Sequence, residues 1–286
     1  IDTGEPNDEA EFITNLMRLD QNSLDYIVCL HGEQDHSGML PLLLDVYPMA
    51  KVVTNEVCKG LLVEMHNLYE MDDRFIIVGQ DDTLDLGGKT LKFYLAPWVH
   101  WPDTMFAEVV EDKVLFTSDF LGTHYASETL FQNDDLPDYL EAAKRYYSAI
   151  MMPFRGSVRE YLELVKTIDP KIIAPSHGPV LQMPAKIVDL YADWASETPK
   201  NKVVVAYVSM HGSTKQMVSF LVDALIQRGI PVNQYNLLDT DSGVLGSAIV
   251  DAATIILATP TVLFGPHPVA VNAAYLVRAL RPKTKY

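Results

Sequence analysis

Nine residues, Leu30-His31-Gly32-Glu33-Gln34-Asp35-His36-Ser37-Gly38, carry the strongest structural signal in this 286-residue chain. They directly follow the apolar run 26–30, which is typical of a short buried strand. Within six residues they offer two imidazoles and two carboxylates, all of which can bind a metal ion. A polar loop with a hydrogen-bonded histidine would explain any one of these side chains by itself. Four potential ligands at one strand exit favour a metal site instead.

The loop geometry predicts how these four side chains point. In an extended loop alternate side chains face the same way, so we expect His31, Glu33 and Asp35 to converge on one position. His36 would point away and reach a neighbouring position. Two metal ions placed side by side are therefore expected.

Three further candidate ligands, His100, Asp119 and His177, each follow a predicted strand. With the first loop they complete a set of three carboxylates and four imidazoles. Asp119 is well suited to bridge two metals. An oxygen-rich set that contains imidazoles suits iron or manganese better than zinc.

Short apolar runs and helical periodicity alternate along residues 1–199, which predicts an α/β domain. The predicted strands are 26–30, 75–78, 90–95, 105–110, 114–116 and 171–174, and the predicted helices are 136–151, 157–168 and 184–197. Ser157 is a plausible helix N-cap, and Asp169-Pro170 a plausible stop.

Residues 200–286 show a β-α-β-α-β order, which predicts a doubly wound parallel sheet. Its strands are expected at 203–208, 232–237 and 254–258, with helices at 214–228 and 242–252. The charge changes sign at the same boundary: residues 1–199 hold 14 basic and 34 acidic side chains, and residues 200–286 hold 8 basic and 4 acidic ones. We therefore place a domain boundary at 199/200.

Two loops of this second domain suit a phosphate-bearing cofactor. Residues 209–214 lead from a buried strand into a helix, where hydroxyls and backbone N–H groups can bind an anion. A plain strand–turn–helix with a hydroxyl cap would look similar. The absence of Gly-Lys-Ser/Thr and of G-x-G-x-x-G excludes a triphosphate loop and a dinucleotide fingerprint. The loop 259–265 follows the next strand at the same edge of the sheet, which favours a ligand site.

Residues 1–199 resemble the metallo-β-lactamase superfamily, an αββα sandwich with metal ligands on loops at one edge. Hydrolytic members show His-x-His-x-Asp-His, whereas this chain has His-x-Glu-x-Asp-His, with Glu33 in place of the second histidine. That pattern, with the downstream ligands, resembles the flavodiiron proteins. The resemblance implies two iron ions: one held by His31, Glu33 and His100, the other by Asp35, His36 and His177, with Asp119 bridging. In some members the residue matching His36 is not a direct ligand.

The second domain resembles flavodoxin, and the resemblance implies FMN bound by its two loops. The residues so implicated are Ser209, Met210, His211, Gly212, Ser213, Thr214, Pro260, Thr261, Val262, Leu263, Phe264 and Gly265. The family pattern extends beyond both ends of the chain, so we expect a fragment of a longer protein.

The resemblance implies an oxidoreductase in which FMN feeds a di-iron site that reduces dioxygen to water or nitric oxide to nitrous oxide. It also implies a head-to-tail homodimer or a dimer of dimers. The expected electron donor is rubredoxin, a rubredoxin/NADH reductase or a reduced deazaflavin coenzyme. Two alternatives stay open: a binuclear zinc hydrolase of the glyoxalase or lactonase kind, and a non-catalytic gas sensor or electron carrier.

Bulk composition narrows the function further. The net charge of −16 argues against nucleic acid as a partner, since phosphate binding needs clustered Lys and Arg. No apolar run approaches the length of a membrane span. With Cys29 and Cys58 alone, a disulfide framework is not expected, and we expect a cytoplasmic protein. His66, His124, His211 and His267 are predicted to be surface or helix-capping residues, and Trp98 and Trp101 to be core or to wall the site.

Overall fold

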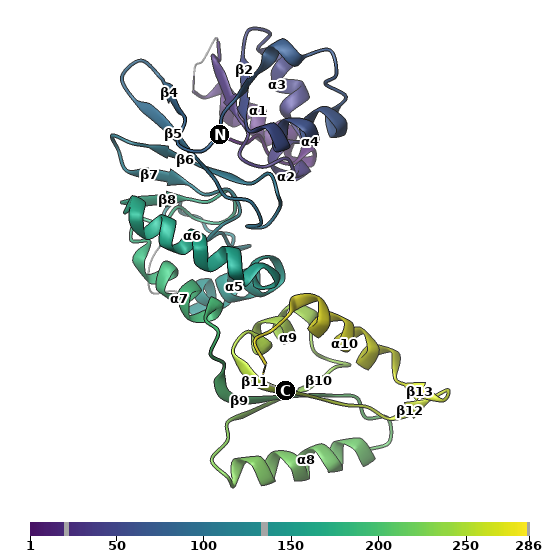
Figure 1. Ribbon diagram of the computed structural model, residues 1–286. Helices are drawn as coiled ribbons and strands as arrows, with labels where there is room; N and C mark the ends of the chain where they lie inside the picture. The colour runs from purple at the N-terminus through teal and green to yellow at the C-terminus, as the bar shows by residue number, and fades with distance from the viewer. Residues whose placement is uncertain (20–22, 133–136, 285–286) are drawn as a thin grey trace. The chain divides into compact units, whose positions relative to one another are not determined.

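The structure is a computed structural model that describes residues 1–19, 23–132 and 137–284 (Figure 1). The chain forms two compact units. Unit 1 consists of residues 1–134 and 163–185, and unit 2 of residues 135–162 and 186–286. This division groups the segment 135–162, which contains α5, with the C-terminal segment. The domain boundary at 199/200 therefore stays a prediction.

Unit 1 contains two sheets. The smaller is parallel, in the order β1-β2-β3, with β1 (Tyr26–Val28), β2 (Lys51–Thr54) and β3 (Phe75–Ile77). The larger runs β4 (Thr83–Asp85), β5 (Thr90–Leu95), β6 (Met105–Val109), β7 (Val114–Phe116) and β8 (Ile172–Ala174). Its strands are antiparallel except for the parallel pair β7 and β8.

The two sheets share a core. Buried side chains of the small sheet and its strand ends, including Val28 and Val53, pack against Phe93, Met105 and Ala107 of the large sheet. Complete burial of such side chains contributes about 1.5 to 3 kcal/mol each. This core fixes the exits of β1, β5 and β7 relative to one another.

Helices cover the other face of the small sheet (Figure 1). They are α1 (Glu9–Met17), α3 (Leu40–Val46) and α4 (Glu56–His66). The same part of the chain also contains the short turns η1 (Pro6–Asp8), α2 (Gln34–Ser37) and η2 (Asp72–Arg74). Leu40, Leu43 and Leu62 pack there against Val52 of β2. The Asn55 side chain caps α4 by accepting a hydrogen bond from the Cys58 N–H.

Unit 2 is built on a parallel sheet in the order β10-β9-β11. Helix α8 lies on one face and α9 and α10 on the other, which is a doubly wound arrangement (Figure 1). Besides β8, the elements from residue 137 onward are α5 (Pro137–Tyr146), the π-turn η3 (Tyr147–Met151), η4 (Met152–Phe154), α6 (Arg155–Ile168), α7 (Ala185–Ala195), β9 (Lys200–Tyr207), α8 (Ser213–Ile226), β10 (Val232–Asn236), α9 (Ser242–Ile249), β11 (Ala252–Ala258), β12 (Thr261–Val262), β13 (Gly265–Pro266) and α10 (Pro268–Leu280).

The predicted α/β class and all predicted strands are confirmed, most of them shifted by a few residues at an end. The predicted N-cap at Ser157 is wrong, because α6 already begins at Arg155. The chain enters α6 from η4 in helical conformation, so no extended capping residue is needed. The predicted stop is confirmed: α6 ends at Ile168, and Asp169 takes a left-handed conformation. Residue 136, the predicted start of a helix, lies outside the described residues.

Candidate metal centre and flavin loops

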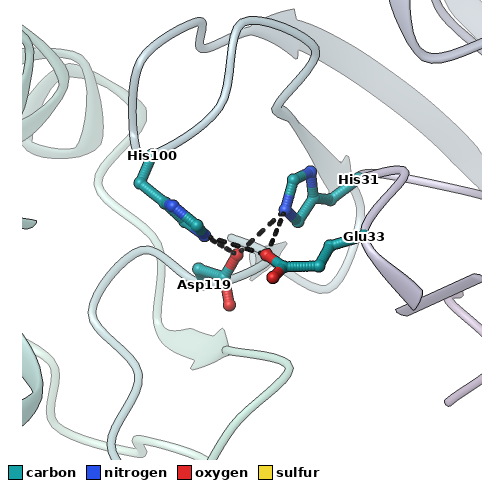
Figure 2. A group of neighbouring side chains, drawn as sticks. All are labelled: His31, Glu33, His100 and Asp119. Carbon is teal, nitrogen blue, oxygen red and sulfur yellow. Dashed lines mark hydrogen bonds and ion pairs between the residues drawn. The ribbon is translucent and has the colours of Figure 1, made fainter. Parts of the chain in front are cut away.

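Strand ends of both sheets in unit 1 bring the seven candidate ligands together. His31 follows β1, His100 lies between β5 and β6, Asp119 follows β7, and His177 follows β8. Their nitrogen and oxygen atoms fall into two groups, each spanning at most 4.8 Å. The first holds His31, Glu33, His100 and Asp119 (Figure 2), and the second holds Asp35, His36 and His177.

The prediction that Asp35 converges with His31 and Glu33 is wrong. The loop is extended only as far as Glu33, and the chain then enters the helical turn α2. Residues in a helical turn do not alternate in direction, so Asp35 turns toward His36 instead. The Oδ1 of Asp35 lies 3.6 Å from His36 Nε2, and its Oδ2 lies 3.2 Å from His177 Nε2.

Asp119 lies between the two groups and contacts an imidazole pair with each oxygen. Its Oδ2 is 3.6 Å from His31 Nε2 and 3.2 Å from His100 Nε2. Its Oδ1 is 3.2 Å from His36 Nε2 and 3.0 Å from His177 Nε2. A carboxylate with this division of contacts can bridge two cations.

Glu33 completes the first group from the side opposite Asp119 (Figure 2). Its Oε2 is 3.3 Å from the Nε2 of both His31 and His100. Spacings of 3.0 to 3.6 Å between facing nitrogen and oxygen atoms suit atoms that share one metal ion through bonds of about 2.1 Å.

Opposite charges hold the two groups together. Burial alone would lower the pKa of His31, but hydrogen bonds to Asp103 and Glu33 outweigh it and raise the pKa to about 9. Burial would also lower the pKa values of His36 and His177. Contacts with carboxylates outweigh this effect and raise the pKa of His36 to about 11 and that of His177 to about 9. Burial would raise the pKa of Asp119, but the surrounding imidazoles hold this pKa well below the ordinary value. The imidazoles and carboxylates of the two groups thus stabilise one another's charged forms.

Two carboxylates that contact the Nδ1 atoms of the imidazoles were not predicted from the sequence. Asp103 Oδ2 lies 3.1 Å from His31 Nδ1, and Asp2 Oδ2 lies 3.2 Å from His36 Nδ1. These pairs are 72 and 34 residues apart in the chain. The one sequence signal for Asp103 is its position three residues after the candidate ligand His100. Nothing in the sequence indicates a role for Asp2.

Aromatic side chains complete the surroundings. The Trp101 ring lies edge-on to the rings of His31 and His100, at centroid distances of 5.0 and 6.1 Å, whereas Trp98 is half exposed. Trp101 therefore walls the first group. His124 is exposed, as predicted, but its ring lies 5.5 Å from that of His177.

The three remaining histidines that were not predicted to be metal ligands lie outside the two ligand groups. His66 ends α4 and its Nε2 lies 2.9 Å from the Ser37 hydroxyl. His267 caps α10 by accepting a hydrogen bond from the Val269 N–H, which confirms the capping prediction. His211 is exposed in the loop before α8.

The two predicted flavin loops leave the same edge of the unit 2 sheet. The Val208 N–H donates to the Ala258 carbonyl over 2.9 Å at the ends of β9 and β11, so the loops begin side by side. In the first loop Gly212 has φ +88°, a conformation that favours glycine, and α8 starts directly after it. The exposed hydroxyl of Ser213 and that of Thr214 stand at this helix start, where an anion is favoured.

The second flavin loop forms the hairpin β12–β13. The Thr259 hydroxyl fixes its base by accepting the His267 N–H over 3.0 Å. Leu263 and Phe264 form the tip with left-handed backbone, and both side chains are exposed. A loop that presents large apolar groups to solvent beside an anion site fits a planar aromatic cofactor with a phosphate. The twelve flavin contacts stay a prediction.

No helix among the described residues is long and apolar enough to cross a membrane.

The chain is similar in sequence to known proteins. Residues 1–178 match the family model described as ODP family beta lactamase. The coenzyme F420H(2) oxidase of Methanothermobacter marburgensis is 34% identical over 273 residues, which cover 93% of this chain and 67% of that protein. The nitric oxide reductase of Moorella thermoacetica is 32% identical over 290 residues, covering 100% of this chain and 72% of that protein.

A solved structure is also similar to the chain. The flavodiiron protein from Giardia intestinalis superposes with a TM-score of 0.89 and 27% sequence identity. The match covers 98% of this chain and 69% of that one. It therefore includes both the metal-ligand loops and the parallel sheet of unit 2.

Proposed function

The chain belongs to the flavodiiron protein family, a group of oxidoreductases with a di-iron centre and FMN, and we propose that it reduces dioxygen to water, nitric oxide to nitrous oxide, or both. The observation that carries this proposal is the position of Asp119 between two imidazole pairs. It divides seven ligands into two adjoining sets that each combine carboxylate and imidazole.

The donor set fits iron. Three carboxylates and four imidazoles supply more hard oxygen atoms than zinc hydrolase sites use, and Glu33 supplies one where those hydrolases have a histidine. His31, Glu33 and His100 would hold one iron, Asp35, His36 and His177 the other, and Asp119 both. When bound, the iron pair and reduced FMN would together supply the electrons, about two from each of the about four that dioxygen needs to become water.

The surrounding residues have distinct tasks in this reaction. The buried His31 and His36 fix the two metal positions, whereas the half-buried His100 and His177 stand on the side nearer to solvent. Trp101 limits the space beside His31 and His100. For FMN, the start of α8 would bind the phosphate, and the hairpin tip would contact the ring.

Electron supply and assembly belong to the same proposal. A reduced deazaflavin coenzyme is one candidate donor, supported by the coenzyme F420H(2) oxidase relative, and rubredoxin or a rubredoxin/NADH reductase is another. We also propose a head-to-tail dimer in the cytoplasm. The relatives named above are an oxidase and a reductase, which favours this proposal over a zinc hydrolase and over a non-catalytic gas sensor or electron carrier.

Anaerobic reduction followed by measured uptake of dioxygen and of nitric oxide tests the proposal, with iron and FMN quantified in the same sample. Glu33→Ala should abolish turnover and leave FMN bound, because Glu33 is one of the proposed metal ligands and is not one of the residues assigned to the flavin loops. The proposal fails if turnover persists in this variant. It also fails if the protein holds two zinc ions, cleaves a thioester or lactone, and takes up no gas.

A further inference from the structure

Each half of the metal centre has one imidazole whose Nδ1 atom, on the side away from the ligand group, contacts a carboxylate. His31 and His36 are both buried, with 0% and 1% exposure, and each presents Nε2 to the ligand group. Their Nδ1 atoms face Asp103 and Asp2 respectively. The side chains of His100 and His177 are more open, with 15% and 23% exposure.

Asp103 connects three segments of unit 1. Its Oδ2 accepts the Gly32 N–H over 2.7 Å as well as contacting His31 Nδ1. Its own carbonyl accepts from the Asn55 amide over 2.6 Å, and Asn55 is the N-cap of α4. Asp103 is 1% exposed. The loop that carries His100 thereby fixes the loop that carries His31.

Asp2 has the equivalent position behind the second group. Its Oδ1 accepts the Leu30 N–H over 2.8 Å, and its Oδ2 accepts from the Ser176 hydroxyl over 2.9 Å while contacting His36 Nδ1. Asp2 takes a left-handed backbone conformation, φ +54°, and its N–H donates to the Val28 carbonyl. The segment before β1 is thus joined to the strand end before His31 and to the loop of His177.

This geometry selects how each imidazole can act. A histidine that ligates through Nε2 keeps its proton on Nδ1, and a carboxylate acceptor there fixes both the tautomer and the ring plane. Loss of such a partner commonly weakens metal binding about 10- to 100-fold. Asp103 and Asp2 share no hydrogen-bond partner among the contacts described above, so each can position its imidazole separately.

We propose that Asp103 and Asp2 are positioning residues that anchor the two iron positions independently, Asp103 through His31 and Asp2 through His36. The inference rests on the proposed ligand set, because it assigns His31 and His36 to different irons. It predicts that one iron can be weakened while the other stays bound.

The test is an anaerobic Fe(II) titration of the full chain, combined with Mössbauer spectra of the loaded protein. Asp103→Asn keeps a hydrogen-bond acceptor but removes the charge, and Asp103→Leu removes both. Asp2→Asn is used alone at its position because asparagine tolerates the left-handed backbone. Glu33→Ala and Asp35→Ala serve as references for damage to the first and the second site. Asp45→Asn, on the exposed side of α3, is the matched control.

We expect the Asp103 variants to weaken one binding step about 10- to 100-fold, more for Leu than for Asn, with the remaining iron showing the Glu33→Ala spectrum. Asp2→Asn should weaken the other step and give the Asp35→Ala spectrum. Asp45→Asn should bind two irons as the wild type does. Thermal unfolding of the metal-free variants separates lost anchoring from lost folding. If Asp103→Leu does not fold, the two asparagine variants decide the result.

The inference is overturned if folded Asp103 and Asp2 variants bind both irons normally, or weaken both steps equally. The proposed function has a different failure: wild-type protein that takes up fewer than two irons refutes the ligand set, whatever the variants do.

Discussion

The metal loops of unit 1 and the flavin loops of unit 2 both follow strand ends, yet they are held in opposite ways. Around the metal centre, Asp119, His31 and His36 are buried and hydrogen-bonded to one another or to carboxylates behind them. In the flavin loops, Met210, Leu263 and Phe264 are exposed. Backbone conformation, together with hydroxyl contacts of Ser209 and Thr259 at the loop bases, gives these loops their shape.

The difference shows how each site is prepared for its cofactor. The metal centre has opposite charges that satisfy each other before a metal arrives, so it should respond most strongly to changes of charge. The flavin loops offer a helix start and an apolar tip that only a ligand or partner would cover. They should respond to changes in backbone preference and apolar area, and the two sites should respond independently.

Asp119→Ala should have the largest effect. Both groups lose the carboxylate that their four imidazoles share, so we expect loss of both irons, beyond the 10- to 100-fold weakening typical of an outer partner. FMN content should stay unchanged. Iron and flavin per chain, measured on the same sample, check this prediction. Asp112→Asn, an exposed carboxylate of unit 1, is the control. Retention of one tightly bound iron would contradict a bridging role.

A change of pH should act on the metal centre rather than on the flavin loops. In the metal-free fold His31 and His177 have pKa values of about 9, above the value of about 6.5 in an unfolded chain. The fold then binds more protons than the unfolded chain, so its extra stability is complete below about pH 6.5 and is lost as the pH rises through about 9. Thermal unfolding of chelator-treated protein between about pH 6 and pH 10 measures this loss.

Iron binding should show the opposite trend. The metals must displace the imidazole protons, so iron affinity rises with pH over the same interval. A midpoint of metal-free unfolding that stays constant or increases toward alkaline pH would show that the imidazole–carboxylate contacts do not stabilise the fold.

The smallest expected effect comes from the hairpin tip. Replacing Leu263 with Asn and Phe264 with Gly supplies residues that adopt left-handed backbone readily, which should stabilise unit 2 by about 1 kcal/mol. If the two side chains contact FMN as predicted, flavin affinity should fall by about tenfold, which corresponds to about 1.4 kcal/mol. This is less than the about 1.5 to 3 kcal/mol for complete burial of one apolar side chain, because a ligand would cover side chains at an exposed tip only in part. Flavin fluorescence titration measures the affinity, and iron content should not change. Undiminished flavin affinity would remove both residues from the proposed flavin site.

The sequence was most informative where chemistry is local. The strand-exit loops with His100, Asp119 and His177 could be placed because apolar runs mark the strands before them. The direction of Asp35 could not, since a single helical turn at α2 interrupts the extended loop. Asp2 and Asp103 were out of reach for another reason: their partners lie far away in the chain, and only the packed sheets bring them together.

The grouping of residues into units also depends on packing. Helical periodicity located α5 and α7 well, but it does not show which sheet or helix a helix packs against. Unit 2 gathers residues 135–162 with the C-terminal segment. Within it, buried Asp251 lies 3.2 Å from Lys144 and 3.0 Å from Lys202. Such long-range ion pairs leave no trace in local sequence patterns.

The contacts of Asp119 also set an order of events in biosynthesis. Its four imidazole partners occupy positions 31, 36, 100 and 177, and the ribosome releases them in that order. A nascent chain that has passed residue 119 holds the bridging carboxylate but still lacks His177. Because chains fold progressively from the N-terminus as they emerge, the cluster closes only once β8 and its loop have been made. Completion of the second group therefore follows synthesis of β8 and its loop, and a chain stalled before His177 would lack one of the three residues of that group.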